Sequence, residues 1–121
     1  MDPKLVVLEF NECISNGDVG GLGQLMSDDH VFIDREGNAT RTKEEMLNGW
    51  IRFFEMFPGY KNTFERVESK GNHVFVLGFA YWSGENQHDP AIWTATILND
   101  LVAEWHIYYD TEENRERFRL R

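Results

Sequence analysis

The sequence has little cysteine, little proline and few basic residues, and it contains no long hydrophobic run. Its single cysteine, Cys13, excludes an intramolecular disulfide. No apolar stretch approaches the roughly 18 residues that span a membrane. The N-terminal Met-Asp-Pro-Lys lacks the charged-then-apolar order of a signal peptide. From these absences we expect a cytoplasmic protein.

Basic residues are outnumbered, with 12 Lys and Arg against 21 Asp and Glu and a formal net charge of −9. Several of the arginines crowd the C-terminus, so the rest of the chain is more acidic still. An acidic surface repels phosphates and anionic lipids. We therefore expect neither a nucleic-acid partner nor a membrane partner.

Aromatic residues are abundant, at 14% of the chain. With 121 residues the chain can build one hydrophobic core, so residues 1–121 are predicted to form a single domain. Large flat side chains either fill a core or wall a cavity, and composition does not distinguish these uses.

The order of predicted elements is helix, short helix, strand, long helix and four further strands, with a last short helix from Thr111. Asp2-Pro3 starts the first helix and Gly17 ends it. Thr42 and Glu45 form a capping box before the long helix, whose apolar stripe is wide enough to line a cavity. The predicted strands cover residues 30–34, 60–69, 73–83, 91–98 and 101–109.

Two of these strands, residues 74–82 and 91–98, are apolar on both faces. An antiparallel strand with one wet face should alternate between apolar and polar residues. One face is therefore predicted to pack on the helices. The other is predicted to pack on a second copy of the chain, which would make a homodimer.

Four motifs in this order resemble the nuclear transport factor 2-like superfamily, in particular its ketosteroid isomerase-like and SnoaL-like polyketide cyclase branches. They lie at residues 16–18, 27–37, 49–58 and 102–111. The resemblance implies an α+β fold of the cystatin-like kind, with a cone-shaped curved antiparallel sheet wrapped by three to four helices around a pocket. It also implies dimerisation through the outer face of the sheet.

Asp34 matches the position at which ketosteroid isomerases carry their general base. A carboxylate among aromatic rings has its charged form disfavoured, which suits proton transfer beside a carbonyl; ketosteroid isomerase itself is a known example of such tuning. The alternative is a strand-end aspartate that caps the turn at Glu36-Gly37. Both readings stay open at this point.

The rest of the isomerase apparatus is missing from the sequence. Phe10 stands where that family has a phenol donor, and phenylalanine donates no hydrogen bond. Thr94 stands where it has a protonated carboxyl group, and we expect it to be at most a weak oxyanion donor.

His106 follows Trp105, where SnoaL-like cyclases tend to place an acid–base aspartate. A histidine with an ordinary pKa can act as acid or base. We therefore hypothesise an acid–base pair of Asp34 and His106 across the pocket. If the apolar face of that strand looks inward instead, His106 is exposed or lies at a dimer contact.

The predicted ligand is a small, flat, apolar molecule with a carbonyl group. Its predicted contacts are Phe10, Phe32, Trp50, Phe54, Thr94 and Tyr108. Phe53, Trp82 and Trp93 are further aromatic candidates for the wall, although for any one of them alone ordinary core packing is the favoured interpretation. The remaining histidines are scattered, and His30, next to two aspartates, is predicted to lie in a solvated turn. No motif indicates a metal or another cofactor.

Three functions agree with these observations. The first is a cofactor-independent isomerase, cyclase or lyase that acts by proton transfer. The second is a non-catalytic ligand-binding or scaffold domain, which the residues at Phe10 and Thr94 favour. The third is a protein adaptor, which would need an exposed hydrophobic patch left over after dimerisation.

Overall fold

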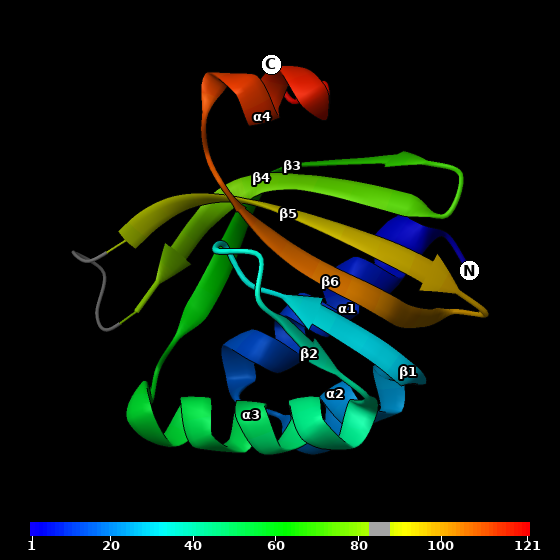
Figure 1. Ribbon diagram of the computed structural model, residues 1–121, viewed down its shortest axis with the longest axis vertical. Coiled ribbons are helices and arrows are strands. Elements are labelled where there is room, and N and C mark those ends of the chain that lie inside the picture. Colours follow the sequence, from blue (N-terminus) through cyan, green and yellow to red (C-terminus); the bar gives the residue numbers. More distant parts are fainter. Residues whose placement is uncertain (83–87) are drawn as a thin grey trace.

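A computed structural model describes residues 1–82 and 88–121, and in this part of the chain one curved sheet is combined with four helices (Figure 1). The helices are α1 (Pro3–Asn16), α2 (Val19–Leu25), α3 (Lys43–Met56) and α4 (Glu112–Arg117). The strands are β1 (Met26–Ile33), β2 (Ala39–Arg41), β3 (Lys61–Lys70), β4 (His73–Tyr81), β5 (His88–Leu98) and β6 (Leu101–Tyr109). The predicted α+β fold is confirmed.

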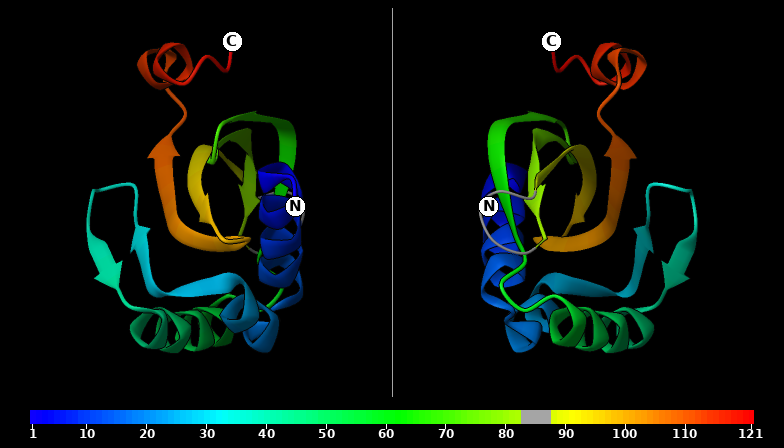
Figure 2. Two further views of the ribbon diagram at one scale, coloured as in Figure 1. Left: turned by 90° about the vertical axis from the view of Figure 1, so that its right-hand side faces the viewer. Right: turned by 90° about the vertical axis from the view of Figure 1, so that its left-hand side faces the viewer.

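The sheet has the strand order β2-β1-β6-β5-β4-β3 and is mixed. β1 pairs with β6 in parallel, and the other neighbours are antiparallel. The sheet curls around α1 and α3, which lie on its inner side, whereas α4 lies on the outside (Figure 2). This arrangement is the predicted cone, with the parallel pair as the one departure from an antiparallel sheet.

The predicted helix caps are present, but only one half of the predicted Thr42–Glu45 capping box forms, because the Thr42 amide bonds to β1 and not to the Glu45 side chain. The Asp2 carboxylate accepts a hydrogen bond from the Lys4 amide at 2.9 Å, and Gly17 ends α1 with φ 65°. The Thr42 hydroxyl accepts from the Glu45 amide at 3.3 Å, while the Thr42 amide donates to the His30 carbonyl. The cap of α3 is therefore also a link to β1, which holds the helix across the inner side of the sheet.

His30 does not lie in a solvated turn, so that prediction is wrong. β1 begins at Met26, four residues earlier than predicted, which places His30 within the strand and on its buried side. Its Nδ1–H donates to the Val102 carbonyl oxygen at 2.7 Å, and its ring lies 6.1 Å from that of Phe10. Burial lowers the pKa of this imidazole, so the neutral form is favoured in the core.

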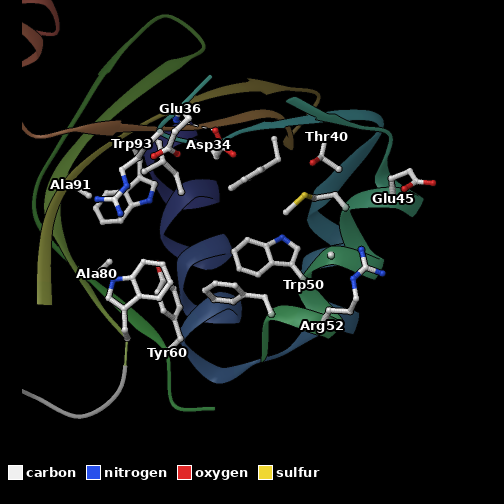
Figure 3. Close-up of a pocket in the computed structure, with 17 residues that line it drawn as sticks. Asp34, Glu36, Thr40, Glu45, Trp50, Arg52, Tyr60, Ala80, Ala91 and Trp93 are labelled. Atoms are coloured by element: carbon white, nitrogen blue, oxygen red, sulfur yellow. Dashed lines mark hydrogen bonds between the residues drawn. The ribbon is translucent and has the colours of Figure 1, made fainter. Parts of the chain in front are cut away.

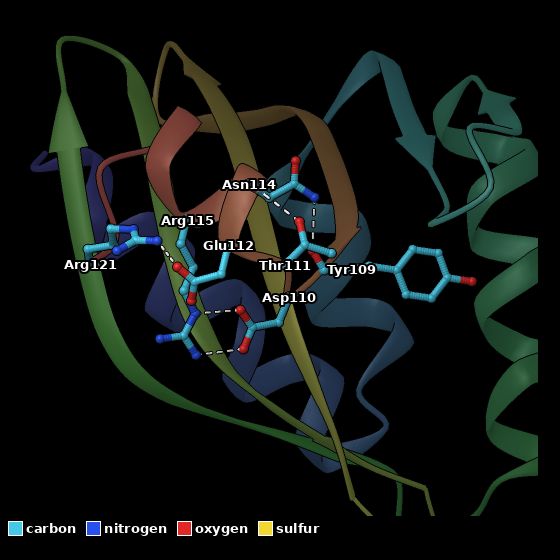
Figure 4. A network of polar contacts seen from close by, with 7 residues as sticks. All are labelled: Tyr109, Asp110, Thr111, Glu112, Asn114, Arg115 and Arg121. Carbon is cyan, nitrogen blue, oxygen red and sulfur yellow. Dashed lines mark hydrogen bonds and ion pairs between the residues drawn. The ribbon is translucent and has the colours of Figure 1, made fainter.

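The chain's own C-terminal segment covers part of the outer face of the sheet. Phe118 stacks on Phe75 with ring centres 5.6 Å apart and packs on Tyr108 at 4.8 Å, while Leu120 joins a separate cluster with Leu77 and Ile92. Figure 4 shows how the segment is held: Asp110 accepts two hydrogen bonds from Arg115, at 2.6 and 2.7 Å. The second apolar face of β4 and β5 thus has a partner within the same chain.

In the described residues, no helix combines the length and the hydropathy that a membrane span requires.

Candidate functional site

A cavity of about 480 Å³ lies between α3 and the inner face of the sheet (Figure 3). Its size is within the range of small-molecule sites, roughly 300–1,000 Å³. It is lined by Phe32, Asp34, Arg35, Glu36, Thr40, Glu45, Met46, Gly49, Trp50, Arg52, Phe53, Tyr60, Ala80, Trp82, Ala91, Trp93 and Ile107.

Six of the lining residues are aromatic, and several of their rings brace one another. Phe53 of α3 packs edge-on against Trp50 at 5.6 Å and against Tyr60 at 4.8 Å, and Tyr60 packs against Trp82 at 5.1 Å. Trp93 of β5 contributes a further indole from the sheet. Such edge-to-face contacts hold each ring in place, so the wall is rigid and flat surfaces are presented to the cavity.

Two of the aromatic wall residues, Trp82 and Tyr60, carry polar groups. The Trp82 indole N–H donates to the Asp89 carboxylate at 2.8 Å. Burial raises the pKa of the Tyr60 hydroxyl, a group that is already protonated at neutral pH.

Charged side chains surround the rim. Asp34 and Glu36 lie on one side of the cavity, and Glu45 and Arg52 lie on the other (Figure 3). The Tyr109 hydroxyl, at the end of β6, donates to the Glu36 carboxylate at 2.6 Å, and the Arg35 guanidinium lies 4.8 Å from the Tyr109 ring centre. The rim is therefore polar, while the interior is apolar.

Asp34 lines the cavity and also braces its own turn. Its Oδ1 accepts from the Glu36 amide at 3.0 Å and from the Asn38 amide at 2.9 Å, and its Oδ2 accepts from the Asn38 side chain at 3.3 Å. The turn-capping reading of this residue is thus present in the structure. Oδ2 has a single, long hydrogen bond in the described residues and keeps capacity to accept a further hydrogen bond.

His106, Thr94 and Tyr108 lie on the outer face of the sheet, away from the cavity. Trp93 and Ile107 line the cavity, and alternation along β5 and β6 turns their neighbours outward. The His106 ring stacks on Tyr108 with centres 3.8 Å apart, and burial there lowers the pKa of its imidazole.

The hypothesised pair of Asp34 and His106 therefore does not meet across the pocket. The sequence did not show which face of β6 points into the cone. The apolar face points inward, and this is the alternative in which His106 lies outside the pocket. The predicted ligand contacts Thr94 and Tyr108 are wrong for the same reason, because both side chains lie on the outer face of the sheet.

Of the remaining predicted contacts, Phe32 and Trp50 line the cavity, whereas Phe10 and Phe54 are not among its lining residues. Phe10 is fully buried against Trp105, with ring centres 4.7 Å apart. Phe54 stacks on Trp50 at 5.3 Å and fixes its orientation.

The sequence analysis singled out Asp34 among the rim charges, but it did not identify the other rim charges or Tyr60 as site residues. One signal was available, because Met46, Gly49, Trp50 and Phe53 follow the spacing of one helix face. This spacing would have identified the side of α3 that faces the cavity, although not the turn that brings Arg35 and Glu36 to the rim.

Within residues 1–82 and 88–121, no three His, Cys, Asp or Glu side chains gather in a way that could hold a metal ion.

Solved structures share this architecture. The chain matches a protein from Shewanella putrefaciens CN-32, classed as a SnoaL-like polyketide cyclase, with a TM-score of 0.80 and 13% identity, over 100% of this chain and 88% of that one. It matches an epoxide hydrolase of M. tuberculosis with a TM-score of 0.79 and 14% identity, over 89% and 82% of the two chains. It matches TerC, crystallised with polyporic acid, with a TM-score of 0.77 and 14% identity, over 95% and 97%.

At these identities the structural likeness shows the fold alone. A search of curated proteins finds no significant match to the sequence. The family model of the SnoaL-like domain, in contrast, matches residues 7–121, nearly the whole chain. The chain therefore belongs to the SnoaL-like domain family.

Proposed function

We propose that the protein binds a flat, largely apolar small molecule inside the cone. The observation that carries this proposal is the cavity itself, walled by aromatic rings from both α3 and the sheet. Burial of apolar area at about 25 cal/mol per Å² would drive binding, and the fixed rings would select a planar shape. The relative crystallised with polyporic acid supports small-molecule binding in this fold.

The test uses Gly49, which lines the cavity from the middle of α3. A Cβ atom at this position would meet no other atom within 4 Å, so a side chain here can grow into the cavity. We would screen polycyclic phenols, enones and fatty acids by thermal shift against Gly49→Ala and Gly49→Leu. A ligand at a hundred times its Kd stabilises the fold by about 2.7 kcal/mol.

Hits should stabilise the wild type and Gly49→Ala, and should lose this effect in Gly49→Leu, in which the larger side chain occupies the binding space. Equal stabilisation of both variants would place the ligand elsewhere and refute the proposal.

Proton transfer by Asp34 is the second candidate function. Its position on the cavity wall favours it, as do relatives classed as polyketide cyclases. Asp34→Asn retains an oxygen for the amides of Glu36 and Asn38, so the turn should persist while the base is lost. We expect turnover of a hit compound to fall by about 10²–10⁴ with little change in its Kd. Unchanged turnover would exclude Asp34 as the base, whereas a hit compound that the wild type does not turn over would leave the non-catalytic binding protein as the function.

A homodimer through the outer face of the sheet remains a proposal, and the area that the C-terminal segment leaves free is its simplest interface. Leu98, at the end of β5, is among the exposed apolar side chains of the described residues. Analytical ultracentrifugation of wild type and Leu98→Glu tests this: a dimer that the substitution dissociates would support it, and a wild-type monomer would refute it.

A further inference from the structure

A ligand reaches the inner wall of the cavity by passing its charged rim. The inner residues Met46, Trp50 and Tyr60 are at most 7% exposed, so solvent hardly reaches them. The rim side chains of Glu36 and Arg52, in contrast, are exposed. Figure 3 shows these two side chains on different sides of the cavity, so the rim between them is its mouth.

The turn of residues 34–38 is the part of this rim that the sheet holds least. β1 is paired with β6 and with β2 only as far as Ile33. Beyond it the turn is braced by its own hydrogen bonds, since Asp34 exchanges bonds with the main chain of Asn38 at 2.9 and 3.0 Å. The other side of the mouth belongs to α3, a helix of 14 residues whose rings pack on one another. The turn can therefore move as a unit at a lower cost than the helix.

Tyr109 holds this turn from the end of β6. The last parallel pair joins Ile33 to His106, and β6 runs on beyond that pair to Tyr109, which brings the tyrosine alongside the turn. Its hydroxyl donates to the Glu36 carboxylate at 2.6 Å, and the Arg35 guanidinium lies 4.8 Å from its ring centre. Among the hydrogen bonds of the described residues, this one alone joins a side chain of the turn to another element.

The main chain of Tyr109 is itself fixed by the C-terminal segment. The Asn114 side chain donates to the Tyr109 carbonyl oxygen at 2.9 Å, and the next residue, Asp110, is held by its two bonds to Arg115. Figure 4 shows the Tyr109 ring projecting away from these contacts. The hydroxyl therefore acts on the turn from an anchored position.

We propose that Tyr109 is a positioning residue that controls passage through the mouth of the cavity: its bond to Glu36 keeps the turn of residues 34–38 in place, and a ligand enters or leaves when this bond breaks. The inference rests on the proposed binding function. Tyr109 is not among the lining residues. Loss of its hydroxyl should therefore speed entry and exit together and leave the Kd nearly unchanged.

Stopped-flow fluorescence with N-phenyl-1-naphthylamine, a neutral aromatic probe, measures both rate constants. Tyr109→Phe keeps a ring beside Arg35 and removes the hydroxyl. We expect its association and dissociation rate constants to rise about three- to tenfold, as the loss of one hydrogen bond provides, with a Kd within about twofold of wild type. Tyr108→Phe, which loses a hydroxyl on the outer face, is the matched control and should behave as wild type. Rates of Tyr109→Phe equal to those of the control, or a change in dissociation alone, would overturn the inference.

Variants of Glu36 test whether the two residues act as one contact. Glu36→Ala removes the acceptor and should match Tyr109→Phe, whereas Glu36→Gln keeps an acceptor oxygen and should exchange the probe more slowly than Glu36→Ala. The double variant Tyr109→Phe/Glu36→Ala should be no faster than either single variant. Additive effects would refute the assignment to this bond.

Quenching of tryptophan fluorescence by acrylamide tests the mouth without a bound ligand. Trp50 and Trp93 line the cavity and are buried, so the quencher must pass the rim to reach them from the cavity side. We expect a larger quenching constant for Tyr109→Phe than for wild type and Tyr108→Phe. Unchanged quenching would overturn the inference whether or not the probe binds. A wild type that binds neither the probe nor any compound of the screen would refute the binding function, and the quenching result alone would then decide the role of Tyr109.

Discussion

Two glycines are expected to respond to the same substitution with opposite signs. Gly49 lies in the interior of α3, does not have a positive φ, and has no atom within 4 Å of an added Cβ. Glycine in a helix interior is about 0.8–1.0 kcal/mol less favourable than alanine. Gly49→Ala should therefore stabilise the fold by about 1 kcal/mol, which corresponds to a rise in Tm of about 3–5 °C for a domain of this size.

Gly71, in the hairpin between β3 and β4, also has open space around an added Cβ, but its φ is 62°. Alanine in this left-handed region costs roughly 1–2 kcal/mol. Gly71→Ala should therefore lower Tm by a similar amount.

Thermal unfolding followed by circular dichroism, with urea titration as a second measure, compares the two variants with wild type. Since steric space is equal at the two positions, the difference isolates the backbone conformation. A fall in Tm for Gly49→Ala would refute the argument, because it would mean that the space beside Gly49 is filled or that α3 is not regular there.

Three further predictions concern the core and the outer face. The pKa of His30 is lowered in the folded protein, so the unfolded chain binds a proton more readily and the free energy of unfolding should fall as the pH drops below 6.5. His30→Asn, which keeps a donor for the Val102 carbonyl, should lose less free energy of unfolding between pH 7 and 5 in urea titrations. An unchanged loss would contradict this prediction. Leu120→Ala should lower the free energy of unfolding by about 2–5 kcal/mol, because Leu120 is 1% exposed. Leu98→Ala, at a residue that is 49% exposed, should change it by less than about 0.5 kcal/mol. Equal effects of the two substitutions would show that the C-terminal segment does not pack on the sheet. Gly78→Ala should prevent folding or lower Tm strongly, because its Cβ would lie 2.1 Å from the Thr63 carbonyl oxygen on β3, and a native-like Tm would mean that β3 and β4 are less closely paired than described.

The fold could be predicted because its signals are local. Caps such as Asp2 and Thr42, and the glycine at Gly17 that ends α1, act on their own neighbours in the chain, so their effect is readable in the sequence. β2 was missed because its three residues are too few to show a period. The parallel pairing of β1 with β6 brings together segments about 70 residues apart, and no local pattern encodes such a contact.

The candidate site was predicted only in part, for a related reason. Phe32 and Trp50 belong to apolar patterns that must face inward, and they line the cavity. The facing of His106 depends on which side of β6 is buried, and the sequence offered an apolar and a polar side without marking either as the inner one. Arg35 and Glu36 reach the rim only through the turn that follows β1, which is a matter of tertiary geometry.

The outer face shows how one sequence pattern can have two physical explanations. Strands that are apolar on both sides need two partners, and the second was predicted to be another copy of the chain. The structure supplies Phe118 and Leu120 from the same chain, against Phe75 and Leu77. A covering segment within the chain avoids the translational and rotational entropy lost when two molecules associate, so it forms at any protein concentration. A dimer must therefore use the remaining surface or displace the segment, and only in the second case should removing the side chain of Leu120 strengthen self-association.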